Sequence, residues 1–171
     1  MPLLKNGEFV DDGFIALDDE APAPEKGGVI VSWDRLKADF EALQARRGGL
    51  GVLFPVTEEP EALKPYLSAL KAIVLSFAAF TDGRAYSIAR IIRARLGFRG
   101  ELRAVGDVLP DQIAFMRQVG FDAFQPRSDR PSLETWQRAA TAMSLSYQSG
   151  FLPPHGYAPA EIFEQRRLRR S

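Results

Sequence analysis

Residues 72–105, AIVLSFAAFTDGRAYSIARIIRARLGFRGELRAV, decide the fold class of this 171-residue chain. They begin with the apolar run 72–77, which is typical of a strand buried on both faces of a parallel sheet. In residues 84–96, apolar side chains recur at helical spacing and share one face of the helical wheel. Residues 101–105 then alternate in character, as a strand does. A strand, a helix and a second strand in this order predict a right-handed crossover between parallel strands.

The alternation continues on the N-terminal side of this unit. Residues 29–31 and 50–54 are apolar runs of strand length. Between them, Ser32 or Asp34 is suited to cap a helix that stops at the Arg-Arg-Gly-Gly sequence of residues 46–49. We therefore expect two more strands joined by a helix.

Further elements follow the same pattern. Residues 57–70 predict a helix that is irregular near its start, because prolines occur there. Residues 110–119 predict a helix that Gly120 closes as a C-cap, followed by a strand over residues 121–125. A last helix is expected to begin at Ser132 and to run to about residue 149.

These elements predict an α/β fold with a mostly parallel sheet of four or five strands in repeated β/α units. Two architectures are open at this point. One is a doubly wound sheet, and the other is a half-barrel, whose edges a partner or an N-terminal hairpin would cover. A closed barrel of eight units is not expected, because 171 residues are too few for it.

The N-terminal region predicts a small β-hairpin. Asn6-Gly7 stands between two short apolar runs, and this dipeptide favours a tight hairpin turn. We assign residues 1–28 to the hairpin and an acidic, proline-bearing loop, within a single α/β domain that spans residues 1–171. Residues 158–171, which end in QRRLRR, are expected to form a flexible basic tail.

Composition narrows the chemistry. The 22 basic residues balance the 22 acidic residues, which argues against nucleic-acid or membrane-surface binding. The chain has no cysteine, so disulfides, thiolate metal sites and thiol redox chemistry of its own are excluded. We assign no residue as a metal ligand. No signal peptide or membrane span is evident, and we expect a cytoplasmic protein. The sequence does not identify a cofactor, and it leaves a homo-oligomer open.

Ligands of parallel α/β sheets bind in loops at the carboxyl ends of the strands. Such a loop holds Asp82, Gly83 and Arg84, with Ser87 one turn further on. These residues stand at a helix N-terminus, which favours an anion such as phosphate, sulfate or a carboxylate. The alternative is structural: Asp82 caps the helix, and Arg84 pairs with Glu101 or Asp107.

Four charged residues in the next strand and loop offer a second set of candidates. Glu101, Asp107 and Asp111 are candidates for acid–base work or, as the alternative, for a hard-cation site, and Arg103 is a candidate for anion binding. Glu101 and Arg103 fall on the same face of one strand, so an intramolecular ion pair is the rival interpretation. Gln112 is expected either to bind a ligand or to face solvent.

The run from Phe80 to Phe124 also resembles a known pattern, F-x-D-G-R-x-Y-S-x-A-x-x-L-R, then G-E-x-R-A-x-G-D-V, then D-Q and G-F-D-x-F. The pattern is matched at Phe80, Asp82, Gly83, Arg84, Tyr86, Ser87, Ala89, Arg93, Gly100, Glu101, Arg103, Ala104, Gly106, Asp107, Val108, Asp111, Gln112, Gly120, Phe121, Asp122 and Phe124. It departs at Ile92, where leucine is usual, and at Gln118-Val119, where an arginine–cysteine pair is usual. On these residues the chain resembles the bacterial family named domain of unknown function 934.

The resemblance implies an association rather than a mechanism. Genes of this family neighbour those of assimilatory sulfite reductase, and some members are labelled probable oxidoreductases. It therefore implies an accessory or interaction protein of sulfite assimilation, with sulfite reductase or its electron donor as the partner. The alternative, which comes from the residues themselves, is a small-anion or phosphate-ligand enzyme whose site includes Asp82–Arg84 and Asp107–Gln112.

Overall fold

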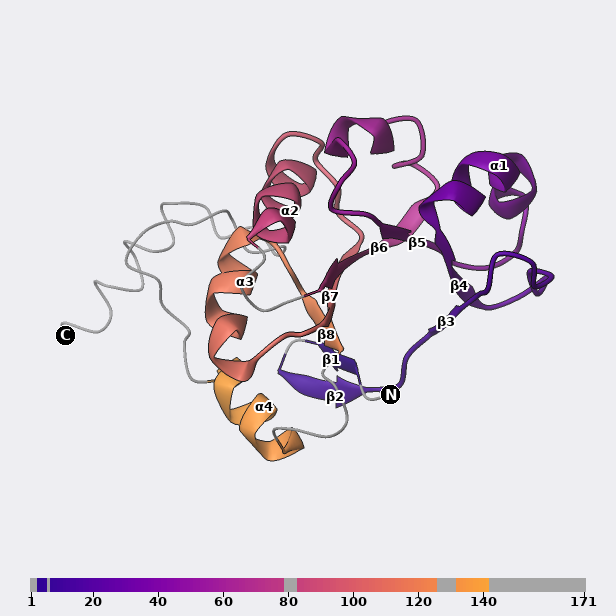
Figure 1. Ribbon diagram of the computed structural model, residues 1–171. Coiled ribbons are helices and arrows are strands. Elements are labelled where there is room, and N and C mark those ends of the chain that lie inside the picture. Colours follow the sequence, from indigo (N-terminus) through magenta and orange to yellow (C-terminus); the bar gives the residue numbers. More distant parts are fainter. Residues whose placement is uncertain (1–2, 6, 79–82, 126–131, 142–171) are drawn as a thin grey trace, which may run out of the picture.

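The computed structural model describes residues 3–5, 7–78, 83–125 and 132–141, and its centre is one curled sheet of eight strands. Along the sheet the strands follow the order β2-β1-β8-β7-β6-β5-β4-β3. Their bounds are β1 Leu3–Lys5, β2 Glu8–Val10, β3 Phe14–Ala16, β4 Gly28–Ser32, β5 Leu50–Phe54, β6 Leu70–Phe77, β7 Glu101–Gly106 and β8 Ala123–Gln125. Figure 1 shows these strands as a half-barrel.

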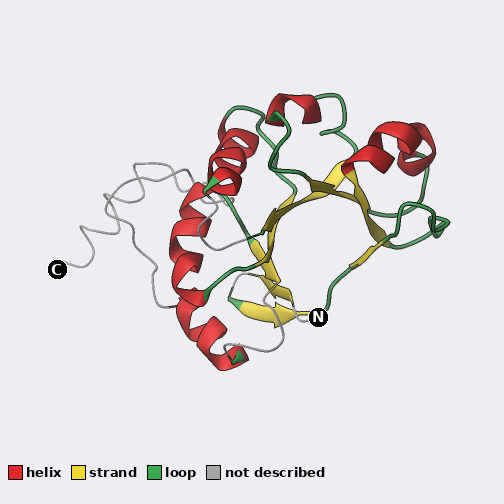
Figure 2. Ribbon diagram, in the orientation of Figure 1, coloured by secondary structure: helices red, strands yellow, loops and turns green. Residues whose placement is uncertain are grey.

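The helices lie outside the arc of strands, as Figure 2 shows. The α-helices are α1 Trp33–Gln44, α2 Arg84–Ala94, α3 Ile113–Val119 and α4 Leu133–Thr141. Two short 3₁₀ helices, η1 Pro60–Leu63 and η2 Pro110–Gln112, complete the described elements. None of the described helices is long and apolar enough to cross a membrane.

The structure confirms the α/β fold and selects the half-barrel, but the predicted strand count of four or five is wrong. The sheet has eight strands, and it is mixed: β3 to β8 pair in parallel, while β1 pairs antiparallel with both β2 and β8. The additional strands are only three residues long, which is too short for a periodic signal. Among them, β3 falls where the sequence predicted no strand.

The predicted N-terminal hairpin is present. Lys5 of β1 is opposite Glu8 of β2, and Gly7 between them has a φ of +88°, which glycine adopts without strain. Strand β1 then joins the hairpin to β8 at one side of the parallel sheet. The hairpin thus covers the edge that β8 would otherwise expose.

The prediction of a helix over residues 57–70 is wrong. Only η1 forms there, and it is followed by turns in which the amides of Tyr66 and Ala69 donate to the carbonyls three residues earlier. Pro60 begins η1, and Pro65 has no amide hydrogen to donate to an α-helical ladder. The prolines therefore turn this crossover into a tight, irregular connection.

The other predicted elements are found close to their expected positions. The Ser32 hydroxyl accepts a hydrogen bond from the Arg35 amide at 3.1 Å and so caps α1. Gly120 closes α3 with a φ of +117°. The helix expected from Ser132 is α4, and its predicted continuation beyond residue 141 lies outside the described residues, as does the expected tail 158–171.

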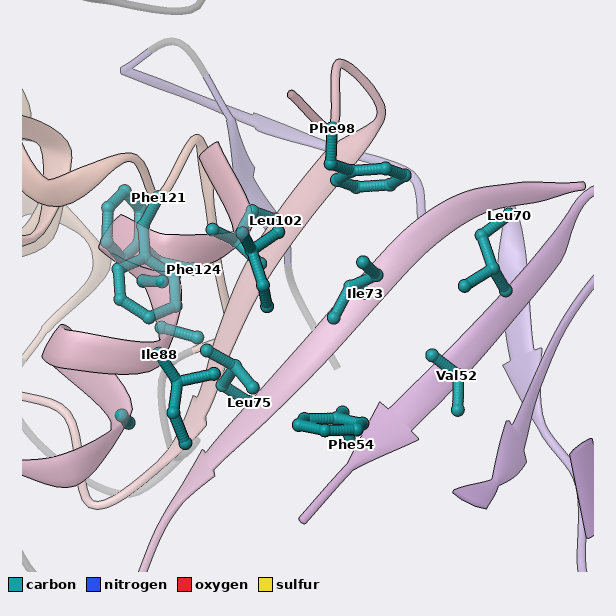
Figure 3. Packing of buried hydrophobic residues seen from close by; sticks show 14 of the residues in the cluster. Val52, Phe54, Leu70, Ile73, Leu75, Ile88, Phe98, Leu102, Phe121 and Phe124 are labelled. Atoms are coloured by element: carbon teal, nitrogen blue, oxygen red, sulfur yellow. The ribbon is translucent and has the colours of Figure 1, made fainter. Parts of the chain in front are cut away.

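Two faces of the sheet have different surroundings. Side chains on the outer face pack against the helices in one buried core, and Figure 3 shows members of it, among them Leu75 of β6 and Ile88 of α2. Because side chains alternate along a strand, the intervening residues face the inside of the half-barrel. The inner face includes small residues such as Gly51 and Ala72, which the register places side by side.

The half-barrel is nearly closed on one side. Its two edge strands are β2 and β3, yet only residues 11–13 join them. A chain of four residues spans at most about 14 Å, so Val10 and Phe14 cannot lie farther apart than that. Residues 11–13, which we call the crossing segment, therefore bridge the opening between the two edges.

Candidate functional site at the open end of the half-barrel

A buried arginine fills the inner face toward the amino ends of the strands. Arg103 of β7 is only 1% exposed, and its guanidinium donates to the Asp12 carboxylate at 2.6 and 2.8 Å. Its Nε donates to one Glu101 oxygen at 2.9 Å, while Lys5 of β1 donates to the other at 2.9 Å. Two cations thus balance two carboxylates, which compensates the burial of charge.

The ring of Phe14 packs beside this network. The Cζ atom of Arg103 lies 5.8 Å from the centroid of that ring. A side chain on Gly28 or Gly49 would meet atoms of the Phe14 ring at 2.8 and 3.1 Å respectively, so these glycines leave room for it. The amino-terminal region of the inner face is therefore packed rather than open.

The surroundings of Asp12 and Arg103 favour the charged form of each side chain. Burial alone would raise the pKa of Asp12, but hydrogen bonds from Arg103 and from the Phe14 amide hold this pKa below its ordinary value. Burial would lower the pKa of Arg103, but hydrogen bonding to Asp12 and attraction to Glu101 raise it above its ordinary value. Both side chains consequently remain charged at neutral pH.

Glu101 and Arg103 are therefore the ion pair that their spacing predicted as the structural alternative. Glu101 begins β7, whereas Asp107 follows the other end of this strand. Six residues of a strand span about 20 Å, so Glu101 and Asp107 lie far apart, at opposite ends of β7. The structure thus separates Glu101 and Arg103 from the other candidate residues.

A second hydrogen-bond network includes further polar residues of the run from Phe80 to Phe124, which we call the central run. Arg93 of α2 donates to the carbonyls of Phe98, Gly100 and Gly120 at 2.7 to 2.9 Å, and to the Asp122 carboxylate at 3.0 Å. Burial raises the pKa of Asp122, and the charge of Arg93 opposes this rise. This network joins the end of α2 to the starts of β7 and β8, and its role is structural.

Toward the carboxyl ends of the parallel strands, the inner face is exposed. The register places Leu53 between Ser32 and the buried Val74, and it places Ser76, Val105 and Gln125 side by side two positions further along β6, β7 and β8. Leu53 is 41% exposed, Ser76 is also exposed, and Ser32, Val105 and Gln125 are half-buried. We call these five residues the open-end surface.

Candidate residues from the loop after β6 lie at this same end. Gly83 directly precedes α2, and Arg84 and Ser87 in the first turns of this helix are exposed. The helix has no acidic side chain in its first turn. Asp82, the predicted cap or anion-site residue, lies outside the described residues.

The loop after β7 brings the remaining candidates to this end. Gly106 has a φ of +92°, and a side chain there would collide with the Phe77 carbonyl, so the strands approach closely. The amide of the next residue, Asp107, donates to the same carbonyl at 2.9 Å. Asp111 follows in η2 and is exposed.

Gln112 has a local structural contact. Its side-chain oxygen accepts a hydrogen bond from the Leu109 amide at 3.1 Å, at the start of η2. Nearby, the rings of Tyr86 and Phe115 lie 5.1 Å apart, and Phe115 is 53% exposed. Burial, and then the charge of Asp111, raise the pKa of Tyr86. Aromatic rings of α2 and α3 thus lie near the charged residue Asp111 of η2.

Sequence reasoning missed Asp12 and Leu53. Asp12 is 91 residues from Arg103, and no local pattern joins them. Leu53 belongs to the apolar run 50–54, in which nothing distinguishes an exposed inner face from a buried outer face. Both residues could be identified only once it was known that the sheet forms a half-barrel with one packed end.

Comparison with known proteins gives a family but no activity. No curated protein and no solved structure matches this chain. Residues 51–156 match the model of a family described as a bacterial protein of unknown function, DUF934. This match covers more than half of the 171 residues, and it includes the whole central run. The chain therefore belongs to the bacterial family DUF934.

Proposed function

We propose that this protein is an accessory protein of assimilatory sulfite reduction, which docks on sulfite reductase or on its electron donor. One observation carries the docking component of this proposal. The open-end surface presents the apolar side chain of Leu53, 41% exposed, in a concave sheet whose other inner residues there include hydroxyl and amide groups. Protein–protein interfaces commonly combine such exposed apolar side chains with polar groups.

The placement of charge favours binding over catalysis. Two residues of the enzyme hypothesis, Glu101 and Arg103, are engaged with Lys5 and Asp12 in the buried network. Arg103 is 1% exposed, so its guanidinium does not meet a ligand from solvent. The link to sulfite reduction rests on the resemblance of the run from Phe80 to Phe124, which implies genes that neighbour those of sulfite reductase.

A pull-down from a native bacterial extract tests this function. The wild-type chain is expected to capture sulfite reductase or its electron donor, identified by mass spectrometry. Leu53→Asp should lose the capture, because it replaces the exposed apolar side chain by a charge. Ile15→Asp is the matched control, because Ile15 is also an exposed apolar residue but lies on the outer face of an edge strand. Absence of both partners from the wild-type capture would contradict the proposal.

Anion binding at the start of α2 is the second candidate function. It is favoured by a helix N-terminus that has exposed Arg84 and Ser87 and no acidic side chain in its first turn. Sulfate and inorganic phosphate are the probes, and calorimetry is the measurement. Arg84→Ala should abolish the binding of either anion, while Arg90→Ala on the same helix should retain it. If the wild type binds neither probe, this candidate is excluded.

A further inference from the structure

A groove lies at the end of the half-barrel opposite to the open-end surface. It has a volume of about 460 Å³, and it is lined by Leu67, Ser68, Leu70, Lys71, Leu96, Gly97, Phe98, Arg99 and Gly100. These residues come from the two segments that lead into the amino ends of β6 and β7. We call it the amino-end groove.

The groove combines an apolar floor with exposed cations. Leu70 and Phe98 are buried, and Leu67 and Leu96 are half-buried. Lys71 and Arg99 are exposed, and neither forms a salt bridge with any residue that the structure describes.

The two cations lie close together because β6 and β7 are neighbours. Ala72 is aligned with Glu101, which places Lys71 beside Gly100, the residue after Arg99. A side chain on Gly100 would approach the Lys71 carbonyl to 2.6 Å, so the two backbones are in direct contact there. Lys71 and Arg99 therefore line neighbouring parts of the groove, and we call this part its rim.

Carbonyl groups in the segment between α2 and β7 would oppose an anion here, but two of them are compensated. Arg93 donates hydrogen bonds to the carbonyls of Phe98 and Gly100 at 2.9 and 2.7 Å. Burial lowers the pKa of Arg93 below its ordinary value, and the charge of Arg99 adds a smaller effect in the same direction. A carboxylate at the rim would offset this repulsion between two arginines.

We infer that the amino-end groove binds an acidic segment of a partner protein, which inserts an apolar side chain between Leu67 and Leu96 and places carboxylates at Lys71 and Arg99. The charge of the rim selects the acidic residues, and the floor selects the apolar one. A protein segment is favoured over a small molecule because Ser68, Lys71, Gly97 and Arg99 are not buried and line the groove on its open side. A small ligand there would remain largely in water, whereas a surrounding interface excludes water.

Fluorescence anisotropy with a labelled peptide tests this inference. The probe is the hexapeptide Asp-Glu-Leu-Phe-Glu-Asp, and the comparison peptide has serine in place of leucine and phenylalanine. The full chain is expected to bind the first peptide more tightly than the second. Lys71→Glu with Arg99→Glu should weaken binding of the first by about tenfold or more.

The matched control is Lys26→Glu with Arg47→Glu. These two cations precede β4 and β5, so they stand at the same end of the sheet but outside the groove. Binding unchanged in this control supports a specific site. Equal loss in both double variants would show general charge attraction and would overturn the inference.

Two further outcomes would also overturn it. One is the absence of any binding of the acidic, apolar peptide at concentrations up to about 1 mM. The other is binding of octanoate, a small amphipathic anion, without binding of the peptide. Methyl NMR shifts at Leu67 and Leu96 on addition of the peptide would locate a positive result in the groove. These outcomes are independent of Leu53 and therefore of the proposed docking at the open end.

Discussion

Arg103 holds Asp12 through two parallel hydrogen bonds, at 2.6 and 2.8 Å, and so ties the crossing segment to a central strand of the sheet. The two residues are 91 positions apart in the chain. Because the crossing segment joins both edges of the half-barrel, this contact fixes how far the sheet curls. It also occupies the amino-terminal region of the inner face and leaves the other end exposed.

Removal of the Arg103 side chain should destabilise the protein strongly. Arg103→Ala leaves Asp12 and Glu101 without their buried partner, which costs about 3 to 5 kcal/mol of unfolding free energy. Urea denaturation at neutral pH measures this change. Lys5→Ala is the control, because Lys5 is partly exposed and its ion pair is worth about 1 kcal/mol or less. Similar losses in the two variants would contradict a central role for Arg103.

Stability should fall in acid partly because of Asp12. Its pKa in the folded protein is lowered below the ordinary value, so its contribution is present above about pH 4. The contribution is lost as the pH falls through the folded pKa, where the carboxylate takes up a proton. Unfolding free energies from pH 7 down to pH 2 should therefore decline less steeply in Asp12→Asn than in the wild type. Parallel curves for the two proteins would show that Asp12 is not held by Arg103 in solution.

Gly120 should tolerate substitution less well than another glycine with positive φ. A side chain at Gly120 would strain a φ of +117° and collide with the Arg93 side chain. Gly97 has a φ of +67° but has no atom in the way, so Gly97→Ala isolates the backbone cost of about 1 to 2 kcal/mol. Gly120→Ala should lower the unfolding free energy further, in thermal or urea denaturation. Equal effects would mean that Arg93 moves aside without cost.

Much of the fold was predictable because the central strands have strong local signals. The run 72–77 is continuously apolar, and Gly120 ends a helix where a left-handed residue is needed. In contrast, the three residues of β3 have no pattern that separates them from a loop. Pro60 and Pro65 favour tight turns over the α-helix that the spacing of apolar residues predicted in this segment.

The candidate site was less predictable than the fold. The i, i+2 spacing of Glu101 and Arg103 indicated their ion pair, since alternate residues of a strand share a face. It did not indicate Asp12 or Lys5, which the curl of the sheet brings to them from the N-terminal region. The exposure of Leu53 likewise depends on which end of the half-barrel is packed, and this depends on tertiary contacts rather than on local sequence.

The most direct test of the proposed docking is biolayer interferometry with the purified chain and, separately, purified sulfite reductase and its purified electron donor. We predict saturable binding of the wild type to one of them, weakened by about tenfold or more in Leu53→Asp and unchanged in Ile15→Asp. Such a result would place the interface at the open-end surface. Absence of binding to both proteins, or equal affinity of the wild type and Leu53→Asp, would contradict the account.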